Sequence, residues 1–470
     1  MHPSSQRVRV IAAVTATALL VSACMVGPTY QRPSAAASER FKAAEGWVDA
    51  APADALDRGT WWTLFDDPVL DALAARVEVS NQNVAAAVAA YAQARALVRE
   101  QRASLFPQVT LDGGASRTGT GVGGSAQASS SFRVGIGAGW EPDVWGRLRR
   151  SVDSAGAVAQ ASEADLASAR LAAQGELVAN YFGVREAEAQ IALLNKTIEG
   201  YEKSLVITRN RYEVGVIART DVLQAETQLA NARADAVGLR RTRAQFENAI
   251  AVLVGESPST FSLPPAQWRT RVPEIPIGVP STLLQRRPDI ASAERRVAAA
   301  NEQIGIAQAA FYPSFNLTGS IGQGAGKLVD LFNASSVLWS LGVSAAQVLF
   351  NAGATRARVE GAQAAHEQAV AQYRQTVLAA LEEVENLLVA SRVLEQQETL
   401  RRQASTAADL VAAQVGNRYR AGQVGYTEVV IAQATALQTR RALVQLLAER
   451  QTTAVALIQA LGGGWREGGG

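Results

Sequence analysis

Residues 131–141 read SFRVGIGAGWE, and two kinds of side chain alternate along them. The apolar ones stand at every second position: Phe132, Val134, Ile136, Ala138 and Trp140. Serine, arginine, glycine and glutamate fill the positions between. Because successive side chains of a strand point to opposite faces, this alternation predicts a strand with one apolar face and one small, polar face. A similar preceding segment, 105–117, makes residues 105–141 a predicted β-hairpin.

The same pattern returns in the second half of the chain, where residues 313–348 predict another β-hairpin. Residues 103–111, ASLFPQVTL, resemble residues 309–317, AAFYPSFNL. Phe106 thus corresponds to Tyr312, 206 residues later, and Arg211 corresponds to Arg418, 207 residues later. A nearly constant offset is the signature of an internal repeat.

The organisation that follows has two repeats joined by a linker. Each repeat has the order helix, two strands, very long helix, break, return helix. The first opens with one helix expected from Pro68 to about Ser104. The predicted segments are a first repeat at 67–255, a Pro-rich connector at 256–287, a second repeat at 288–461 and a C-terminal tail at 462–470.

Long helices account for most of each repeat. Residues 147–211 and 354–418 contain no proline and are rich in Ala, Leu, Gln, Glu and Arg. About 65 residues at about 1.5 Å each would span about 100 Å. Gly215 and Gly422 then break the two helices, because glycine permits a tight reversal of the chain.

Composition argues against an enzyme and against a resident cofactor or metal. Lys+Arg 45 against Asp+Glu 43 leaves a net charge of +2, which gives no basic face for nucleic acid. There is one cysteine, and the two histidines are His2 and His366. The positions one helical turn from His366 hold alanine, glutamine and valine, so no second metal ligand is available there. We therefore expect no catalytic residue, no cofactor and no metal site.

The N-terminus is predicted to be an export signal with a lipid anchor. Arg7 and Arg9 precede an apolar run, residues 10–23, that is too short to span a membrane. It ends in small residues directly before the only cysteine, Cys24, as in a bacterial lipobox. Residues 1–23 are therefore a predicted signal peptide, and residues 24–66 a segment anchored through lipidation (palmitate) of Cys24. By resemblance to bacterial lipoproteins, in which aspartate after the cysteine favours retention in the inner membrane, Met25 favours the outer membrane.

Two interpretations of the strands are open at this point. One is a half-buried sheet in a soluble domain. The other is a transmembrane β-barrel with lipid outside and water inside, which the export signal, the aromatics near the strand ends and the small polar faces favour. Lipid tolerates no open sheet edge, and closed barrels begin at about eight strands, so four strands per chain require several copies.

Several motifs together resemble the TolC-like outer membrane factor family, most closely its NodT/OprM-type lipoprotein branch, which serves resistance–nodulation–division (RND) efflux pumps. The resemblance covers nearly all of the mature chain. It rests on CMVGPTY at 24–30, WWTLFDDP at 61–68, RRPDI at 286–290, FYPS at 311–314 and LGGGW at 461–465.

The resemblance implies an α+β membrane protein, a homotrimer with a 12-stranded β-barrel, four strands from each protomer, continued by a long α-helical periplasmic barrel. It implies the outer membrane exit duct of a tripartite efflux system, through which small molecules pass passively. The implied partners are a periplasmic adaptor (a membrane fusion protein), an inner-membrane RND transporter and outer membrane lipid. A type I protein-secretion duct and a non-conducting envelope scaffold lipoprotein are the alternatives.

The resemblance also implies roles for residues at the ends of the long helices. The adaptor-docking tips are Val214, Gly215, Val216, Gly422, Gln423 and Val424. Gate or constriction roles fall on Asp221, Tyr419 and Glu428. The family's latch arginine, however, falls at Val424, so Arg418, Arg420 and Arg219 are the candidates to replace it.

Overall fold

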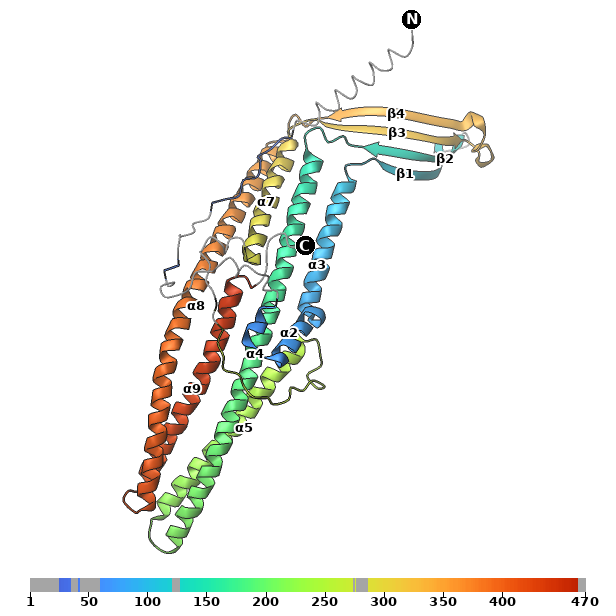
Figure 1. Ribbon diagram of the computed structural model, residues 1–470. Coiled ribbons are helices and arrows are strands. Elements are labelled where there is room, and N and C mark those ends of the chain that lie inside the picture. The colour runs from blue at the N-terminus through green and yellow to red at the C-terminus, as the bar shows by residue number, and fades with distance from the viewer. Residues whose placement is uncertain are drawn as a thin grey trace. The chain divides into compact units, whose positions relative to one another are not determined.

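The computed structural model describes residues 25–34, 41–42, 60–120, 127–273, 275 and 286–463 (Figure 1). The chain forms two compact units. Unit 1 comprises Met1–Ser34, Ala90–Glu163 and Ser292–Arg374, and unit 2 comprises Ala35–Ala89, Ala164–Ala291 and Gln375–Gly470. Cys24, the predicted lipidation site, lies outside the described residues, as do parts of the predicted connector and tail.

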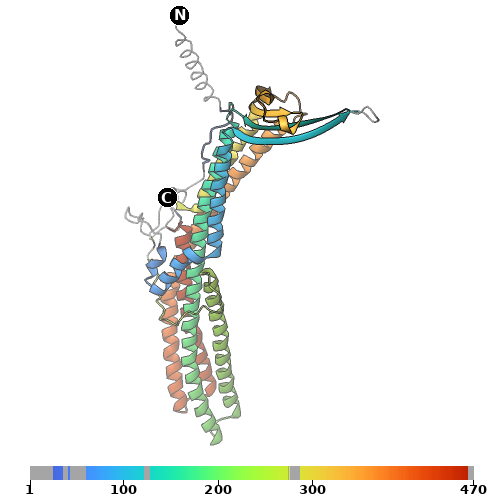
Figure 2. The same cartoon turned by 90° about the vertical axis from the view of Figure 1, so that its right-hand side faces the viewer.

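Unit 1 contains a four-stranded antiparallel sheet with the order β1-β2-β3-β4. Its strands are β1 (Gln108–Thr120), β2 (Gln127–Trp140), β3 (Ser314–Ala325) and β4 (Val337–Ala346), and they curve along their length (Figure 2). Two short 3-10 turns, η3 (Leu328–Asp330) and η4 (Ala334–Ser336), lie between β3 and β4. Each of β1 and β4 has one strand neighbour in the described sheet and one edge without a partner.

The strands of the first hairpin reach further than the sequence predicts. The predicted strand segments end at 117 and resume at 131, but in the structure residues 118–120 and 127–130 are also strand, since Thr118 pairs with Ser129 and Thr120 pairs with Gln127. These small residues carry no apolar alternation, and their backbones nevertheless continue the ladder of hydrogen bonds.

The helices repeat with the predicted offset. The first set is α3 (Gln82–Ala103), α4 (Arg147–Glu213) and α5 (Arg219–Leu253), and the second is α7 (Pro288–Ala309), α8 (Ala354–Arg420) and α9 (Tyr426–Ala460). Both bounds of α8 fall 207 residues after those of α4, and both bounds of α9 fall 207 residues after those of α5.

The single helix predicted from Pro68 to Ser104 is wrong, because the structure breaks it at Asn81. Helix α2 (Pro68–Ser80) ends there, and Asn81 has an extended backbone with ψ 124°. The Asn81 carboxamide oxygen accepts from the backbone N–H groups of Asn83 and Val84 at 2.9 and 3.1 Å, and its nitrogen donates to the carbonyl of Leu253 at 2.9 Å. Asn81 therefore caps a new helix, as asparagine commonly does.

Unit 2 buries an aromatic cluster where its N-terminal elements meet α4. Trp61 and Phe65, from the 3-10 helix η2 (Trp61–Phe65), are 2% and 1% exposed. The rings of Phe65 and Phe182 meet edge to face with centroids 5.0 Å apart. The Tyr181 hydroxyl donates to Asp67 at 2.6 Å, so the N-cap residue of α2 is also a buried acceptor. These contacts hold the WWTLFDDP segment against α4 in the core of this unit.

Candidate functional site

The sheet presents one apolar face along its whole width. Residues directly opposite in an antiparallel pair share a face. One such row across the four strands is Leu111, Ile136, Ile321 and Trp339, with side chains between 50% and 76% exposed. Large apolar groups that no described part of the chain covers need an apolar surrounding, since each costs free energy in water.

Apart from Leu338 near the start of β4, the opposite face is lined by small and polar groups. The row next to the apolar one is Thr110, Gly137, Ser320 and Ser340, and the hydroxyls of Ser320 and Ser340 hydrogen-bond at 2.8 Å. Asp112 lies on this same face and accepts from Thr110 at 2.8 Å. A sheet with lipid-compatible and water-compatible faces of this kind is what a wall between membrane and aqueous lumen requires.

Aromatic side chains gather where the strands meet the helices of unit 1. Trp140 donates its indole N–H to the carbonyl of Leu105 at 2.9 Å, and Trp145 donates to Pro313 at 2.7 Å. The rings of Trp145 and Tyr312 stack with centroids 4.8 Å apart. Aromatic rings with a satisfied polar atom suit the level of the lipid headgroups.

The residues just after Cys24 are bound to unit 1, in a contact that the sequence does not reveal. We call residues 25–30 the N-terminal strap. Val26 donates its backbone N–H to Trp145 at 3.1 Å, while Arg150 donates to the carbonyls of Val26 and Pro28 at 2.7 and 3.3 Å. Arg150 also pairs with Glu302 at 2.5 Å, with side chains only 5% and 14% exposed.

The two helical hairpins of unit 2 end in the same kind of turn, at the same end of the unit (Figures 1 and 2). Gly215 and Gly422 have φ of +78° and +75°, a region in which glycine carries no Cβ penalty. Val214 and Val216 are 73% and 68% exposed, whereas Val424 is half-buried against a cluster of buried residues. An exposed valine is thus present only at the tip of the first hairpin.

That cluster of buried residues lies behind the tips and joins both hairpins. Its members are Leu194, Tyr201, Leu205, Val222, Ala225, Leu229, Ala232, Ala236, Tyr419, Tyr426 and Val429. The rings of Tyr419 and Tyr426 lie 5.4 Å apart. Burial and the neighbouring Tyr419 raise the pKa of Tyr426 to about 12, so this phenol remains neutral at any physiological pH.

The predicted gate residues are close in the fold but are not directly joined to one another. Asp221 and Glu428 occupy the first turns of α5 and α9, and Glu428 is exposed. The Tyr419 hydroxyl is buried, and it has no hydrogen-bond partner among the described residues. No bond therefore connects Tyr419 to Asp221 within the described chain.

Arg211, which the sequence analysis does not select, makes the link between the two hairpins. Its guanidinium donates to the carbonyls of Tyr419 and Arg420 at 3.1 and 3.0 Å. The same group lies over the Tyr419 ring, 4.6 Å from its centroid. Neither Arg420, which bonds to Asn417 and Gly416 of its own helix, nor the exposed Arg219 takes this place. The internal repeat could have indicated Arg211, because it corresponds to Arg418, which the sequence analysis does select.

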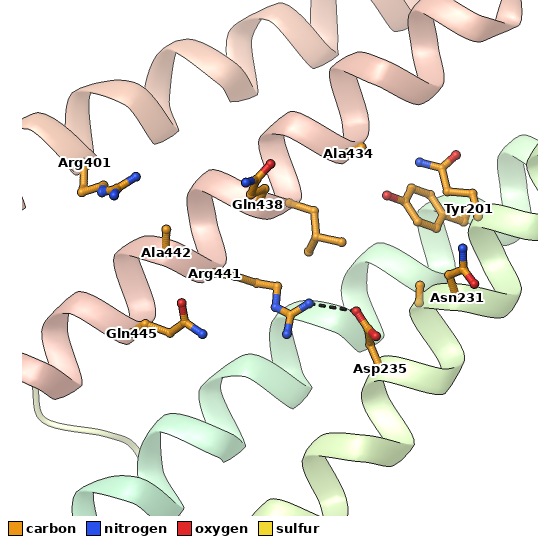
Figure 3. A pocket seen from close by; sticks show the side chains of 12 residues that line it. Tyr201, Asn231, Asp235, Arg401, Ala434, Gln438, Arg441, Ala442 and Gln445 are labelled. Atoms are coloured by element: carbon orange, nitrogen blue, oxygen red, sulfur yellow. Dashed lines mark hydrogen bonds and ion pairs between the residues drawn. The ribbon is translucent and has the colours of Figure 1, made fainter.

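A polar pocket of about 550 Å³ lies further along unit 2 (Figure 3). Arg441 and Asp235 form an ion pair across it at 2.8 Å, and Arg441 also donates to Gln190 at 3.3 Å. The Gln228 carboxamide at its wall is buried without a partner among the described residues. The side-chain amides and the paired Arg441 of this pocket can donate and accept hydrogen bonds with polar groups that enter it.

The sheet and the helices together define a class of protein. An outer membrane channel is built from parts of this kind. They are a curved sheet with one lipid-compatible face, aromatic residues where the strands join the helices, and two repeated long helical hairpins. No helix among the described residues is long and apolar enough to span a bilayer.

Comparison with known proteins identifies the family. The model of the outer membrane efflux protein family matches residues 73–256 and 279–463, and the chain belongs to this family. It is 30% identical over 455 residues to the cation efflux system protein CusC of Escherichia coli O6:H1, covering 96% of this chain and 98% of CusC.

Solved structures agree with this assignment. The outer-membrane channel OprN superposes with a TM-score of 0.88 at 32% identity, over 94% of this chain and all of that one. The open state of the MtrE outer membrane channel of Neisseria gonorrhoeae gives 0.84 at 29% identity, over 94% and 99%. The predicted TolC-like fold class is confirmed, and the chain is an outer membrane efflux channel protein.

Proposed function

We propose that three copies of this chain form the exit duct of a tripartite RND-type efflux system. The observation that carries the proposal is the two-faced sheet with free edges at β1 and β4. Joining β4 of one copy to β1 of the next closes the sheet, places the apolar rows against lipid and encloses the serine, threonine and glycine rows around water.

The duct takes its energy from its partners. The helical hairpins extend the lumen into the periplasm, where their tips dock a periplasmic adaptor, and an inner-membrane RND transporter supplies the solute. The exposed Val214 and Val216 are apolar groups available for such docking. CusC is described as part of a cation efflux system, which makes metal ions one substrate class to test alongside drugs and dyes.

The experiment is deletion of the gene in a strain without redundant ducts. We expect increased susceptibility to at least one drug, dye, solvent or metal, measured as the minimal inhibitory concentration and restored by the intact gene on a plasmid. Unchanged tolerance across a broad panel would count against efflux. Loss of a secreted protein without any change in tolerance would favour the type I secretion alternative.

We also propose that Cys24 is acylated and becomes the mature N-terminus. Several acyl chains contribute about 0.8 kcal/mol for each buried CH₂, which gives firm attachment. We expect Cys24→Ser to abolish incorporation of labelled palmitate, with the unchanged chain labelled in parallel as the control. Labelling that persists in Cys24→Ser would overturn the assignment.

The ends of the long hairpins are proposed to form the gate. Glu428 from three copies lines a constriction and attracts cations, while Asp221 and Tyr419 belong to the contact surfaces that rearrange on opening. Arg211 replaces the latch arginine that the family carries at the position of Val424. It holds the second hairpin by its backbone rather than through an ion pair.

A further inference from the structure

The tips of the two hairpins are built from matching hydrogen bonds. In the first, Val216 donates to the carbonyl of Arg211 at 2.9 Å, and Gly215 to that of Tyr212 at 2.8 Å. In the second, Gln423 donates to Arg418 at 2.9 Å, and Gly422 to Tyr419 at 3.0 Å. Both turns are Schellman motifs, and every residue of one corresponds to the residue 207 positions later in the other.

One of these two helix ends is capped by an arginine, whereas no side chain among the described residues caps the other. The last carbonyls of a helix have no partner within the helix and carry its negative dipole end, so a cation stabilises them. At the end of α8, Arg211 supplies that cation and covers Tyr419, which is 7% exposed. At the end of α4, the corresponding Tyr212 is 43% exposed.

Arg418, the residue that corresponds to Arg211, is available to make the same kind of contact with another helix end. Arg418 is exposed, and its side chain has no polar partner among the residues that the structure describes. The α4 end of its own chain belongs to the hairpin whose Arg211 already caps α8. Because no described side chain of the same chain caps the α4 end, that end can accept an arginine from another copy.

We propose that Arg418 of one copy caps α4 of the next copy. Its guanidinium donates to the carbonyls of Tyr212 and Glu213 and lies over the Tyr212 ring, repeating the Arg211 contact across the subunit boundary. The inference rests on the proposed trimer, in which first and second hairpins alternate around the ring. Six arginine contacts, three within chains and three between them, then hold the hairpin tips together.

Charge favours the contact between subunits over its counterpart within the chain. Arg211 approaches the carbonyl of Arg420, a residue with the same charge. Arg418 would approach Glu213, whose carboxylate adds an opposite charge at the equivalent position. The proposed subunit contact thus brings together the exposed Tyr212, the exposed Arg418 and the oppositely charged Glu213.

The position of the contact can be tested by thiol crosslinking of the purified, detergent-solubilised protein. Cysteines are placed at 418 and 213 by the double change Arg418→Cys/Glu213→Cys. The matched pair Arg211→Cys/Arg420→Cys samples the contact within the chain. A short bifunctional thiol reagent should link subunits into dimers and trimers on denaturing gels for the first pair, and should produce only a linked monomer for the second. Each single variant controls for reaction at Cys24.

Native mass spectrometry of the same samples separates the two proposals. A trimer that gives the intrachain link but no link between subunits would overturn the Arg418 contact and leave the proposed duct intact. A monomer would overturn both.

A functional measurement complements the crosslinking. Arg418→Ala removes all three contacts between subunits from each trimer. We therefore expect it to raise the fraction of time that single channels conduct in planar bilayers at least about tenfold, the factor that one lost charge-assisted hydrogen bond alone would give. Arg420→Ala is the control, since that side chain bonds to its own helix. Equal conduction by Arg418→Ala and the unchanged chain would count against the contact.

Discussion

Chains carrying Leu341→Arg are expected not to appear in the outer membrane as assembled trimers. Leu341 lies in the middle of β4 on the apolar face and is 79% exposed. An arginine facing lipid near the bilayer midplane costs about 2–4 kcal/mol, so three copies cost about 6–12 kcal/mol for each barrel. That is comparable with the whole stability of a typical folded domain.

The neighbouring position provides a matched control. Ser340 belongs to the same strand, but it faces the polar side and pairs with Ser320. Ser340→Arg should therefore assemble. Both variants are measured by the amount of protein in isolated outer membranes and by trimer bands that survive without boiling. Normal assembly of Leu341→Arg, or failure of Ser340→Arg alone, would show that the assignment of the two faces is reversed or that no barrel forms.

The proposed ring of Glu428 predicts a channel that prefers cations, and Glu428→Gln is expected to remove most of that preference. Three carboxylates at one level of a narrow lumen create a local potential that concentrates cations and repels anions. The change is nearly isosteric and leaves the exposed first turn of α9 able to fold, so the effect is electrostatic. The measurement is the reversal potential of channels in a tenfold salt gradient.

Two further variants test whether position and charge both matter. Glu428→Asp retains the charge and should remain cation-selective. Glu449→Gln removes the same charge from an exposed site further along α9, and should leave the reversal potential unchanged. A reversal potential that responds equally to Glu428→Gln and Glu449→Gln would mean that general surface charge, and not a ring at the gate, sets selectivity.

The features that the sequence predicts best are those with a local period. Alternation along residues 131–141 predicts β2, and the offset between Arg211 and Arg418 predicts both helical hairpins. Each pattern is visible in the sequence because it depends only on neighbouring or repeated residues. The sequence does not predict the break at Asn81, because asparagine also occurs on helix surfaces. Its capping role depends on the carbonyl of Leu253, far away in the chain.

The contacts of Arg211 and Arg150 could not be predicted for a related reason. Each arginine bonds to backbone carbonyls of a distant segment, and a carbonyl has no side-chain identity that a sequence could show. The family resemblance points to side chains that correspond to a known latch. In the structure, the arginine that links the two hairpins is Arg211, and its acceptors are main-chain carbonyls.

The N-terminal strap limits where acyl chains on Cys24, as proposed above, could lie. Arg150 and Trp145 hold residues 26 and 28, so at most a few residues separate the first fixed backbone atom from Cys24. So short a segment between Cys24 and the strap allows almost no movement of residue 24 relative to unit 1. Fatty acids attached at residue 24 would stay near the Trp145 and Tyr312 rings. They would therefore fix the depth of the proposed barrel in the lipid leaflet.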